Sequence, residues 1–136
     1  MKIDGGCHCG HIGFEAEIDP GTVQICHCTD CQTLTGTAFR IVVPAAKEAF
    51  RLRTGQPKIY IKTAESGAKR VQAFCPDCGT SIYSCAVDDP QMFMVRIGAI
   101  RQRAELEPKS QHWCRSALPW LMQPDAIGRI ARRETR

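Results

Sequence analysis

Several features that would place this chain among membrane, secreted or repeat proteins are absent from its sequence. No apolar run approaches the roughly 20 residues that a membrane-spanning helix needs. Residues 1–4 do not form the charged-then-apolar start of a secretory signal. Internal repeats, linkers and stripes of mixed basic and aromatic residues are also missing. We therefore expect one cytoplasmic domain over residues 1–136, with no membrane partner.

Disulfides are disfavoured too, although the chain contains nine cysteines in 136 residues. The number is odd, an export signal is absent, and the cysteines occur at short spacings. Because the cytoplasm keeps thiols reduced, such spacings indicate metal ligands.

The formal charge of +4 favours an anionic partner when taken alone. That value omits ionised cysteines. If seven thiolates held two Zn²⁺ ions, most of the positive charge would be cancelled. Net charge therefore gives no support for nucleic acid as a partner.

Short extended segments recur at short intervals, with little helix and no strand–helix–strand alternation. This pattern predicts a mainly β domain. Residues 11–18 alternate apolar and polar side chains, as a half-buried strand does. Further strands are predicted at 23–26, 37–43, 50–52, 58–62, 69–74, 82–84 and 92–97.

The segments between these strands carry turn signals. Residues 5–10 are predicted to be a glycine-flanked turn, and the strand over 37–43 is expected to end at Pro44. A short helical turn is expected over residues 45–50. One interpretation of residues 124–136 is a short helix with Ala126, Ile127 and Ile130 facing inward, whereas the default expectation is a solvated tail.

Cys75 and Cys78 form the strongest local metal signal. Two thiolates three residues apart fit a tight turn, and Gly79 permits the positive φ angle that such a turn often needs. Cys7 and Cys9 can supply two more ligands, because the neighbouring glycines let the backbone bend. The result would be a closed four-thiolate Zn²⁺ site that ties the start of the chain to its middle.

Cys26, Cys28 and Cys31 then remain, one ligand short of a structural zinc. In a different partition, Cys28 and Cys31 would join Cys75 and Cys78 in a two-knuckle ribbon. That arrangement leaves three cysteines without a role, and both partitions stay open on spacing alone.

Three cysteine motifs, in this order along the chain, resemble the glutathione-dependent formaldehyde-activating enzyme family, which also includes centromere protein V. They are Gly6-Cys7-His8-Cys9-Gly10, Cys26-His27-Cys28-x-x-Cys31 and Phe74-Cys75-x-x-Cys78-Gly79. The run His112-Trp113-x-x-Ser116-x-x-Pro119-Trp120 is similar to the family's C-terminal signature. One departure is Gln32-Thr33-Leu34, where many members have basic residues.

The resemblance implies a β-tent of small antiparallel sheets organised around two Zn²⁺ ions. Cys7, Cys9, Cys75 and Cys78 would hold a structural zinc. Cys26, Cys28 and Cys31 would hold a catalytic zinc with an open fourth position. The family's named activity joins formaldehyde to glutathione to give S-(hydroxymethyl)glutathione, a carbon–sulfur lyase reaction.

We accordingly expect a zinc-dependent enzyme that adds a thiol, glutathione or a similar one, to an aldehyde such as formaldehyde. One alternative is a non-catalytic zinc-binding module for protein or nucleic-acid interaction. Another is a redox or metal-sensing role for the three-cysteine site.

Other residues carry chemistry without a spacing that selects them. Arg40, Arg96 and Arg101 could each bind a substrate carboxylate. Cys85 and Cys114 are expected to be buried small hydrophobes. Possible proton carriers, ligand-orienting groups and pocket walls are His8, His27, Asp30, His112, Trp113 and Trp120.

Overall fold

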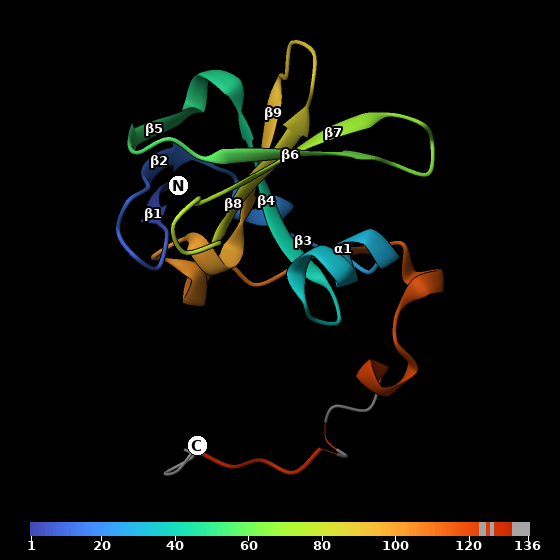
Figure 1. The fold of residues 1–136 in the computed structure, drawn as a ribbon. Coiled ribbons are helices and arrows are strands. Elements are labelled where there is room, and N and C mark those ends of the chain that lie inside the picture. The colour runs from blue at the N-terminus through green and yellow to red at the C-terminus, as the bar shows by residue number, and fades with distance from the viewer. Residues whose placement is uncertain (123–124, 126, 132–136) are drawn as a thin grey trace.

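The computed structural model describes residues 1–122, 125 and 127–131, and its strands form two sheets (Figure 1). The smaller sheet is antiparallel and has the order β1-β2-β5. Its strands are β1 (Lys2–Gly6), β2 (Gly13–Glu17) and β5 (Phe50–Thr54).

The larger sheet has the order β10-β3-β4-β9-β8-β7-β6. Neighbouring strands are antiparallel, except that β10 runs parallel to β3. The mainly β prediction is therefore confirmed. The strands are β3 (Gln24–Cys26), β4 (Arg40–Ala46), β6 (Lys58–Thr63), β7 (Lys69–Phe74), β8 (Ser81–Ala86), β9 (Met92–Arg96) and β10 (Ser110–His112).

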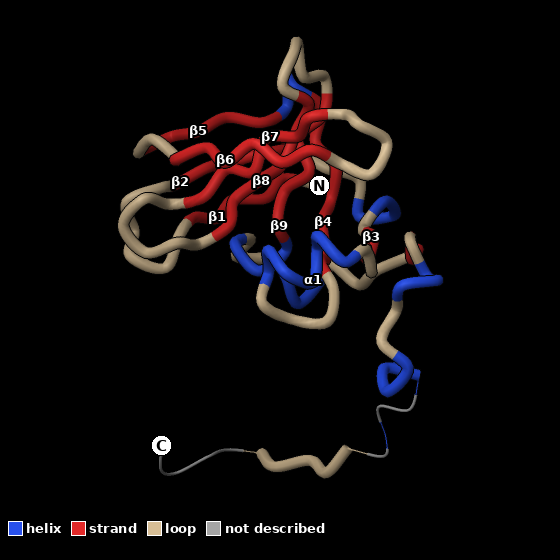
Figure 2. The backbone as a smooth tube through the Cα atoms, turned by 45° about the vertical axis from the view of Figure 1, so that its right-hand side comes forward, coloured by secondary structure: helices blue, strands red, loops and turns tan. Residues whose placement is uncertain are grey.

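One short α-helix, α1 (Thr29–Thr35), lies beside the ends of β4 and β9 (Figure 2). It is the only α-helix in the described part of the chain. The remaining helical segments are 3₁₀ turns at Pro20–Thr22, Lys47–Ala49, Ile97–Ala99, Arg103–Glu105, Cys114–Ser116 and Pro119–Met122.

The hydrophobic core joins the two sheets. Phe14 of β2 is 1% exposed, and its ring stacks on Phe50 at a centroid distance of 5.6 Å. Phe50 in turn stacks on Phe93 of β9 at 5.1 Å. Along β2, Phe14 and Ala16 are buried while Glu17 is exposed, so this strand is half-buried as its alternation predicts.

The turn expected over residues 5–10 is present over residues 7–10, where the Gly10 amide donates to the Cys7 carbonyl at 3.2 Å, but Gly5 and Gly6 belong to β1. Gly5 lies where a Cβ atom would be 2.0 Å from the carbonyl oxygen of Ala99. The glycine therefore allows a close approach between β1 and the backbone of the 3₁₀ turn Ile97–Ala99.

The expected end of a strand at Pro44 is wrong, because β4 continues to Ala46. Pro44 lies opposite Met94 of β9. On its other side, β4 pairs with β3 only over residues 40–42. The missing proline N–H is tolerated because this stretch of β4 has a strand neighbour on one side only. The helical turn expected over residues 45–50 is present as the 3₁₀ turn Lys47–Ala49.

Where the C-terminal tail is described, its exposure agrees with the default expectation of a solvated tail and not with an inward apolar face. Ile127 is 55% exposed and Ile130 is 85% exposed. Ala126 lies outside the described residues. Among the described residues, no helix is long and apolar enough to span a membrane.

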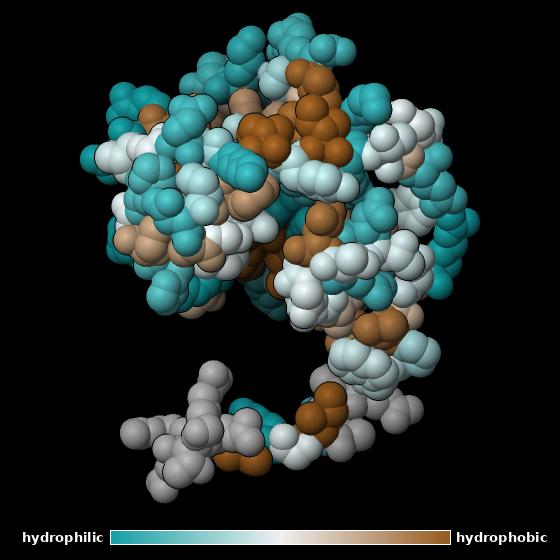
Figure 3. All heavy atoms as spheres, in the orientation of Figure 1, coloured by the Kyte–Doolittle hydropathy of each residue, from teal (hydrophilic) through white to brown (hydrophobic). Residues whose placement is uncertain are grey.

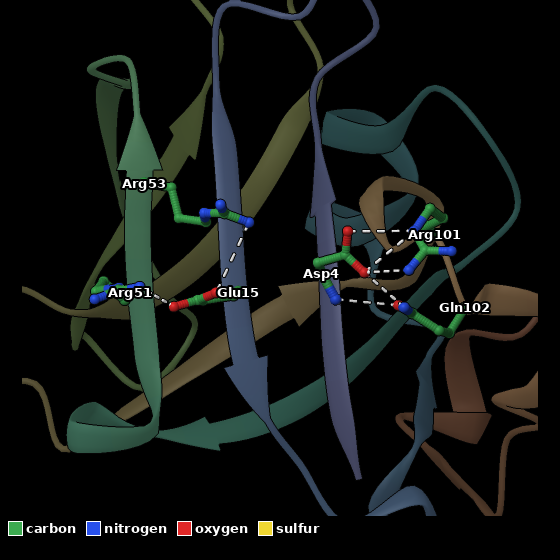
Figure 4. A network of polar contacts seen from close by, with 6 residues as sticks. All are labelled: Asp4, Glu15, Arg51, Arg53, Arg101 and Gln102. Atoms are coloured by element: carbon green, nitrogen blue, oxygen red, sulfur yellow. Dashed lines mark hydrogen bonds and ion pairs between the residues drawn. The ribbon is translucent and has the colours of Figure 1, made fainter.

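The smaller sheet carries a network of charged side chains (Figure 4). Asp4 of β1 accepts from Arg101 at 2.8 Å and from the amide of Gln102 at 2.6 Å. Glu15 of β2 pairs with Arg51 of β5. The contact with Arg101 joins β1 to the segment that follows β9.

Candidate metal centre

Four cysteine sulfurs converge from two turns that lie far apart in the sequence. Cys7 and Cys9 follow β1, and Cys75 and Cys78 follow β7. The Cys9 sulfur lies 3.6 Å from that of Cys7 and 3.7 Å from that of Cys75. A tetrahedral ion with Zn–S bonds near 2.3 Å has sulfurs about 3.8 Å apart. The four-cysteine cluster therefore has the dimensions of a metal site.

The turn after β7 has the geometry that the Cys-x-x-Cys-Gly pattern predicts. The Gly79 amide donates to the Cys75 carbonyl at 2.9 Å, and Gly79 adopts a φ of 81°. The Asp77 amide points at the Cys75 sulfur at 3.4 Å. The Thr80 hydroxyl, 3.2 Å from the Cys78 sulfur, lowers the pKa of Cys78 to about 5. These donors favour thiolates, which are the form that binds a metal.

Cys26, Cys28 and Cys31 form a second cluster where β3 meets α1. Cys26 is the last residue of β3, Cys28 caps the helix, and Cys31 lies in its first turn. The Cys31 amide donates to the Cys28 sulfur at 3.3 Å. The Cys28 and Cys31 sulfurs are 2.9 Å apart, closer than in such a tetrahedron, and all three sulfurs lie within 4.8 Å of one another.

In the described part of the chain, the three-cysteine cluster has no fourth ligand of the usual kinds. Within residues 1–122, 125 and 127–131, no His, Asp, Glu or further Cys offers a ligand atom that joins this group. The four-cysteine cluster, in contrast, holds a full tetrahedral set. An ion in the second cluster would therefore keep a position free for an external ligand.

Electrostatics in the second cluster favour negative charge on the Cys26 sulfur over that of Cys31. The hydrogen bond from the Cys31 thiol lowers the pKa of Cys26 to about 5, while the same contact raises the pKa of Cys31. Arg40 lies beside them, with its Nη1 atom 3.5 Å from the Cys31 sulfur. Both clusters thus have the donor chemistry and the spacing of metal sites, and the two-knuckle partition does not form.

A family model described as "Glutathione-dependent formaldehyde-activating enzyme" matches residues 2–116. The chain belongs to the glutathione-dependent formaldehyde-activating enzyme family. A solved structure of a Rhodobacter sphaeroides protein, a structural genomics target, is similar in fold with a TM-score of 0.61. The two sequences are 19% identical, and the match covers 79% of this chain and 98% of the other.

In this family member, the histidines beside the cysteine ligands take no place in either cluster. His27 is 4% exposed, and its Nε2 atom lies 2.7 Å from the side-chain oxygen of Gln111. His8 is exposed, and its backbone amide donates to Thr80. His112 contacts Ser110 at 3.2 Å. None of these rings completes a metal site.

Other predicted candidates lie elsewhere. Asp30 forms an ion pair with Lys62 at 3.1 Å. Cys85 is buried in β8 as expected, but Cys114 is exposed, so that expectation is wrong for Cys114. Cys114 begins a 3₁₀ turn outside the core, which explains its exposure. Trp113 and Trp120 are 44% and 54% exposed.

The sequence pattern did not single out the two buried arginines that lie near the three-cysteine cluster. Arg40 is 7% exposed and Arg96 is 6% exposed. Burial, followed by the charge of Arg40, lowers the pKa of Arg96 to about 9. Arg101 is different, because it is exposed and pairs with Asp4. The sequence did contain one sign that Arg96 is buried, because Arg96 is the one charged residue in the most apolar strand.

Two adjoining cavities open beside these arginines. One has a volume of about 420 Å³ and the other of about 610 Å³. The surface is hollowed between α1 and the strands (Figure 3). Both cavities are lined by Leu34, Arg40, Gly79, Ser81 and Arg96. None of the cluster cysteines lines these two cavities, and Arg40 connects them to the Cys31 sulfur. A further cavity of about 680 Å³ lies over the charged network on the smaller sheet.

Proposed function

We propose that each cysteine cluster holds Zn²⁺ and that the protein catalyses carbon–sulfur bond formation between a thiol and an aldehyde. Cys7, Cys9, Cys75 and Cys78 would hold a structural ion. Cys26, Cys28 and Cys31 would hold the catalytic one. The observation that carries the proposal is that three sulfurs converge with no fourth ligand from the described residues, while the other cluster has a complete set of four cysteines.

Zn²⁺ at the three-cysteine cluster would supply an open position at which a thiol loses its proton at neutral pH. The thiolate sulfur then attacks the carbonyl carbon of the aldehyde. One carbon–sulfur bond forms, the carbonyl electron pair moves to oxygen, and that oxygen takes up one proton. The product is a hydroxymethyl thioether when the aldehyde is formaldehyde. Glutathione is the thiol that the family's name suggests.

The chain's own residues would position the reactants. Arg40 places positive charge beside Cys31, where it offsets the excess negative charge of three thiolates. The short helix α1 fixes Cys28 and Cys31 relative to each other through the capping contact. The neighbouring cavities offer room for a substrate partly removed from water.

Cobalt substitution tests whether a thiol enters the open position. In the Co²⁺-substituted protein, we expect glutathione or a smaller thiol to change the thiolate-to-cobalt charge-transfer absorption. The matched control is Cys28→Ser, in which the four-cysteine cluster is intact and thiols should have no effect. An unchanged spectrum for every thiol tested on the unaltered protein would exclude direct thiol ligation.

Metal content tests the assignment of ligands. We expect two Zn²⁺ per chain in the unaltered protein and one in Cys28→Ser, measured by elemental analysis after gel filtration. Cys114→Ser, an exposed cysteine outside both clusters, should retain two. Two tightly held ions in Cys28→Ser would refute the assignment. Two ions that both resist chelators in the unaltered protein, with no thiol response, would favour the non-catalytic module.

A further inference from the structure

The buried arginines lie on one face of the larger sheet. Val42 of β4 is directly opposite Arg96 of β9. Arg40 is two residues before Val42 and so shares its face. Arg40 and Arg96 therefore extend from neighbouring strands to the same side, where both line the two cavities.

Their hydrogen bonds to the chain leave donors free. Arg96 donates to the side-chain oxygen of Gln72 at 2.9 Å and to the Met94 carbonyl at 3.4 Å. Arg40 contacts the Cys31 sulfur. The Nε atoms of both arginines are buried and have no hydrogen-bond partner. These Nε atoms have almost no accessible surface, so a ligand in the cavities would be held by the terminal guanidinium nitrogens, whose remaining N–H groups can donate to its acceptors.

The charges around this face are not balanced by the chain. Among the described residues that line the two cavities, none is acidic. Three thiolates and one divalent ion sum to a single negative charge, whereas two guanidinium groups carry two positive charges. One positive charge remains while the open zinc position holds a neutral ligand, and one negative charge from outside would balance it.

The walls indicate what the rest of the ligand is like. Leu34, Tyr60, Phe74 and Tyr83 line the cavity of about 420 Å³ together with the arginines. Such a mixture of apolar walls and a few charged groups suits a small organic molecule with one anionic end. A carboxylate matches the planar, forked donor geometry of a guanidinium.

We propose that Arg40 and Arg96 form a carboxylate-binding subsite for a small organic monoanion with an apolar body. Its place beside Cys31 makes this monoanion the thiol or aldehyde substrate, and that further role rests on the proposed function. The subsite would select acidic substrates over neutral ones of equal size. It differs from Arg101, whose charge is already paired with Asp4.

Benzoate and benzamide provide a matched pair of probes, because they have the same size and differ in charge. With the metal-loaded protein, we expect calorimetry to show benzoate binding about tenfold more tightly or better. Arg96→Met should remove this preference. Arg53→Met, an exposed arginine of β5, should retain it. Equal affinity for the two probes in the unaltered protein, or an undiminished preference in Arg96→Met, would overturn the subsite.

A measurement on the unaltered protein keeps the test decisive if Arg96→Met does not fold. NMR shift changes caused by benzoate should centre on Leu34, Phe74 and Tyr83, and shifts confined to the smaller sheet would contradict the proposal. The cobalt experiment separates the two ideas. Benzoate binding without any thiol response would support the subsite and reject the proposed reaction. A thiol response without a preference for benzoate would support the proposed reaction and reject the subsite.

Discussion

At the scale of single residues, Gly79 shows how a metal-binding turn depends on backbone conformation. Its φ of 81° is disfavoured for a residue with a Cβ atom, although nothing lies within 4 Å of the place a Cβ would occupy. We expect Gly79→Ala to lower the free energy of unfolding by about 1 kcal/mol. Chemical denaturation of the metal-loaded protein measures this loss.

Gly98 is the matched control, because it too has open space around its Cβ position but does not have a positive φ. Gly98→Ala should leave the denaturation midpoint nearly unchanged or raise it slightly. Equal losses in both variants would mean that the added methyl group, and not the backbone angle, determines the cost.

The cysteines were predictable residue by residue, and the arginines were not. A thiol has few roles in a reduced protein, so short cysteine spacings point to metal before any fold is known. An arginine is usually exposed, and only the register of β4 and β9 shows that Arg40 and Arg96 share a buried face. Cys114 was mispredicted because composition does not reveal that it lies outside the core.

At the scale of elements, Asp4 of β1 joins this strand to the segment after β9. Hydrogen bonds from Arg101 and then from Gln102 lower the pKa of Asp4 below its ordinary 3.8. The stability that this carboxylate contributes is therefore complete above pH 3.8. It is lost as the pH falls through the lower value of the folded state.

We expect Arg101→Gln to raise the pKa of Asp4 towards 3.8, as measured by NMR titration of its side-chain carbonyl. Arg51→Gln is the control, because Arg51 pairs with Glu15 and does not contact Asp4. A pKa of Asp4 that stays equally low in Arg101→Gln would show that the hydrogen bond in Figure 4 does not form in solution.

Elements with clear periodicity were predictable, and those set by tertiary contacts were not. The alternation in β2 and the apolar run of β9 identify these strands directly. Helix α1 has seven residues, fewer than two full turns, which is too short for a repeating apolar pattern, and it begins where Cys28 accepts the capping amide. In β1, the sequence alone suggests that Gly5 is a turn residue. The structure shows instead that glycine is needed there because the Ala99 backbone lies so close.

At the scale of the whole molecule, the two clusters differ in the length of chain that they close. The contact between Cys9 and Cys75 joins residues 66 positions apart. The cluster of Cys26, Cys28 and Cys31 joins neighbours within one connection between β3 and α1. Spacing alone could not decide between the two partitions, because that choice depends on where β1 and β7 end in space.

This difference predicts unequal effects on stability from equal chemical changes. A cross-link closing a loop of about 66 residues restricts the unfolded chain by about 4 kcal/mol, and a loop of a few residues restricts it far less. We expect Cys9→Ser to lower the melting temperature by about 10 °C or more. Cys28→Ser should lower it by only a few degrees while removing one ion.

The comparison is a fair one because Cys9 is exposed, so its replacement leaves the core intact. Differential scanning calorimetry on both variants, purified with Zn²⁺ present, gives the two shifts. A chelator should first remove the thiol-responsive ion from the three-cysteine cluster while the fold persists. The chain should unfold only when the ion in the four-cysteine cluster is lost. Equal shifts for the two variants, or a larger one for Cys28→Ser, would mean that the four-cysteine cluster is not the clamp that joins β1 to β7.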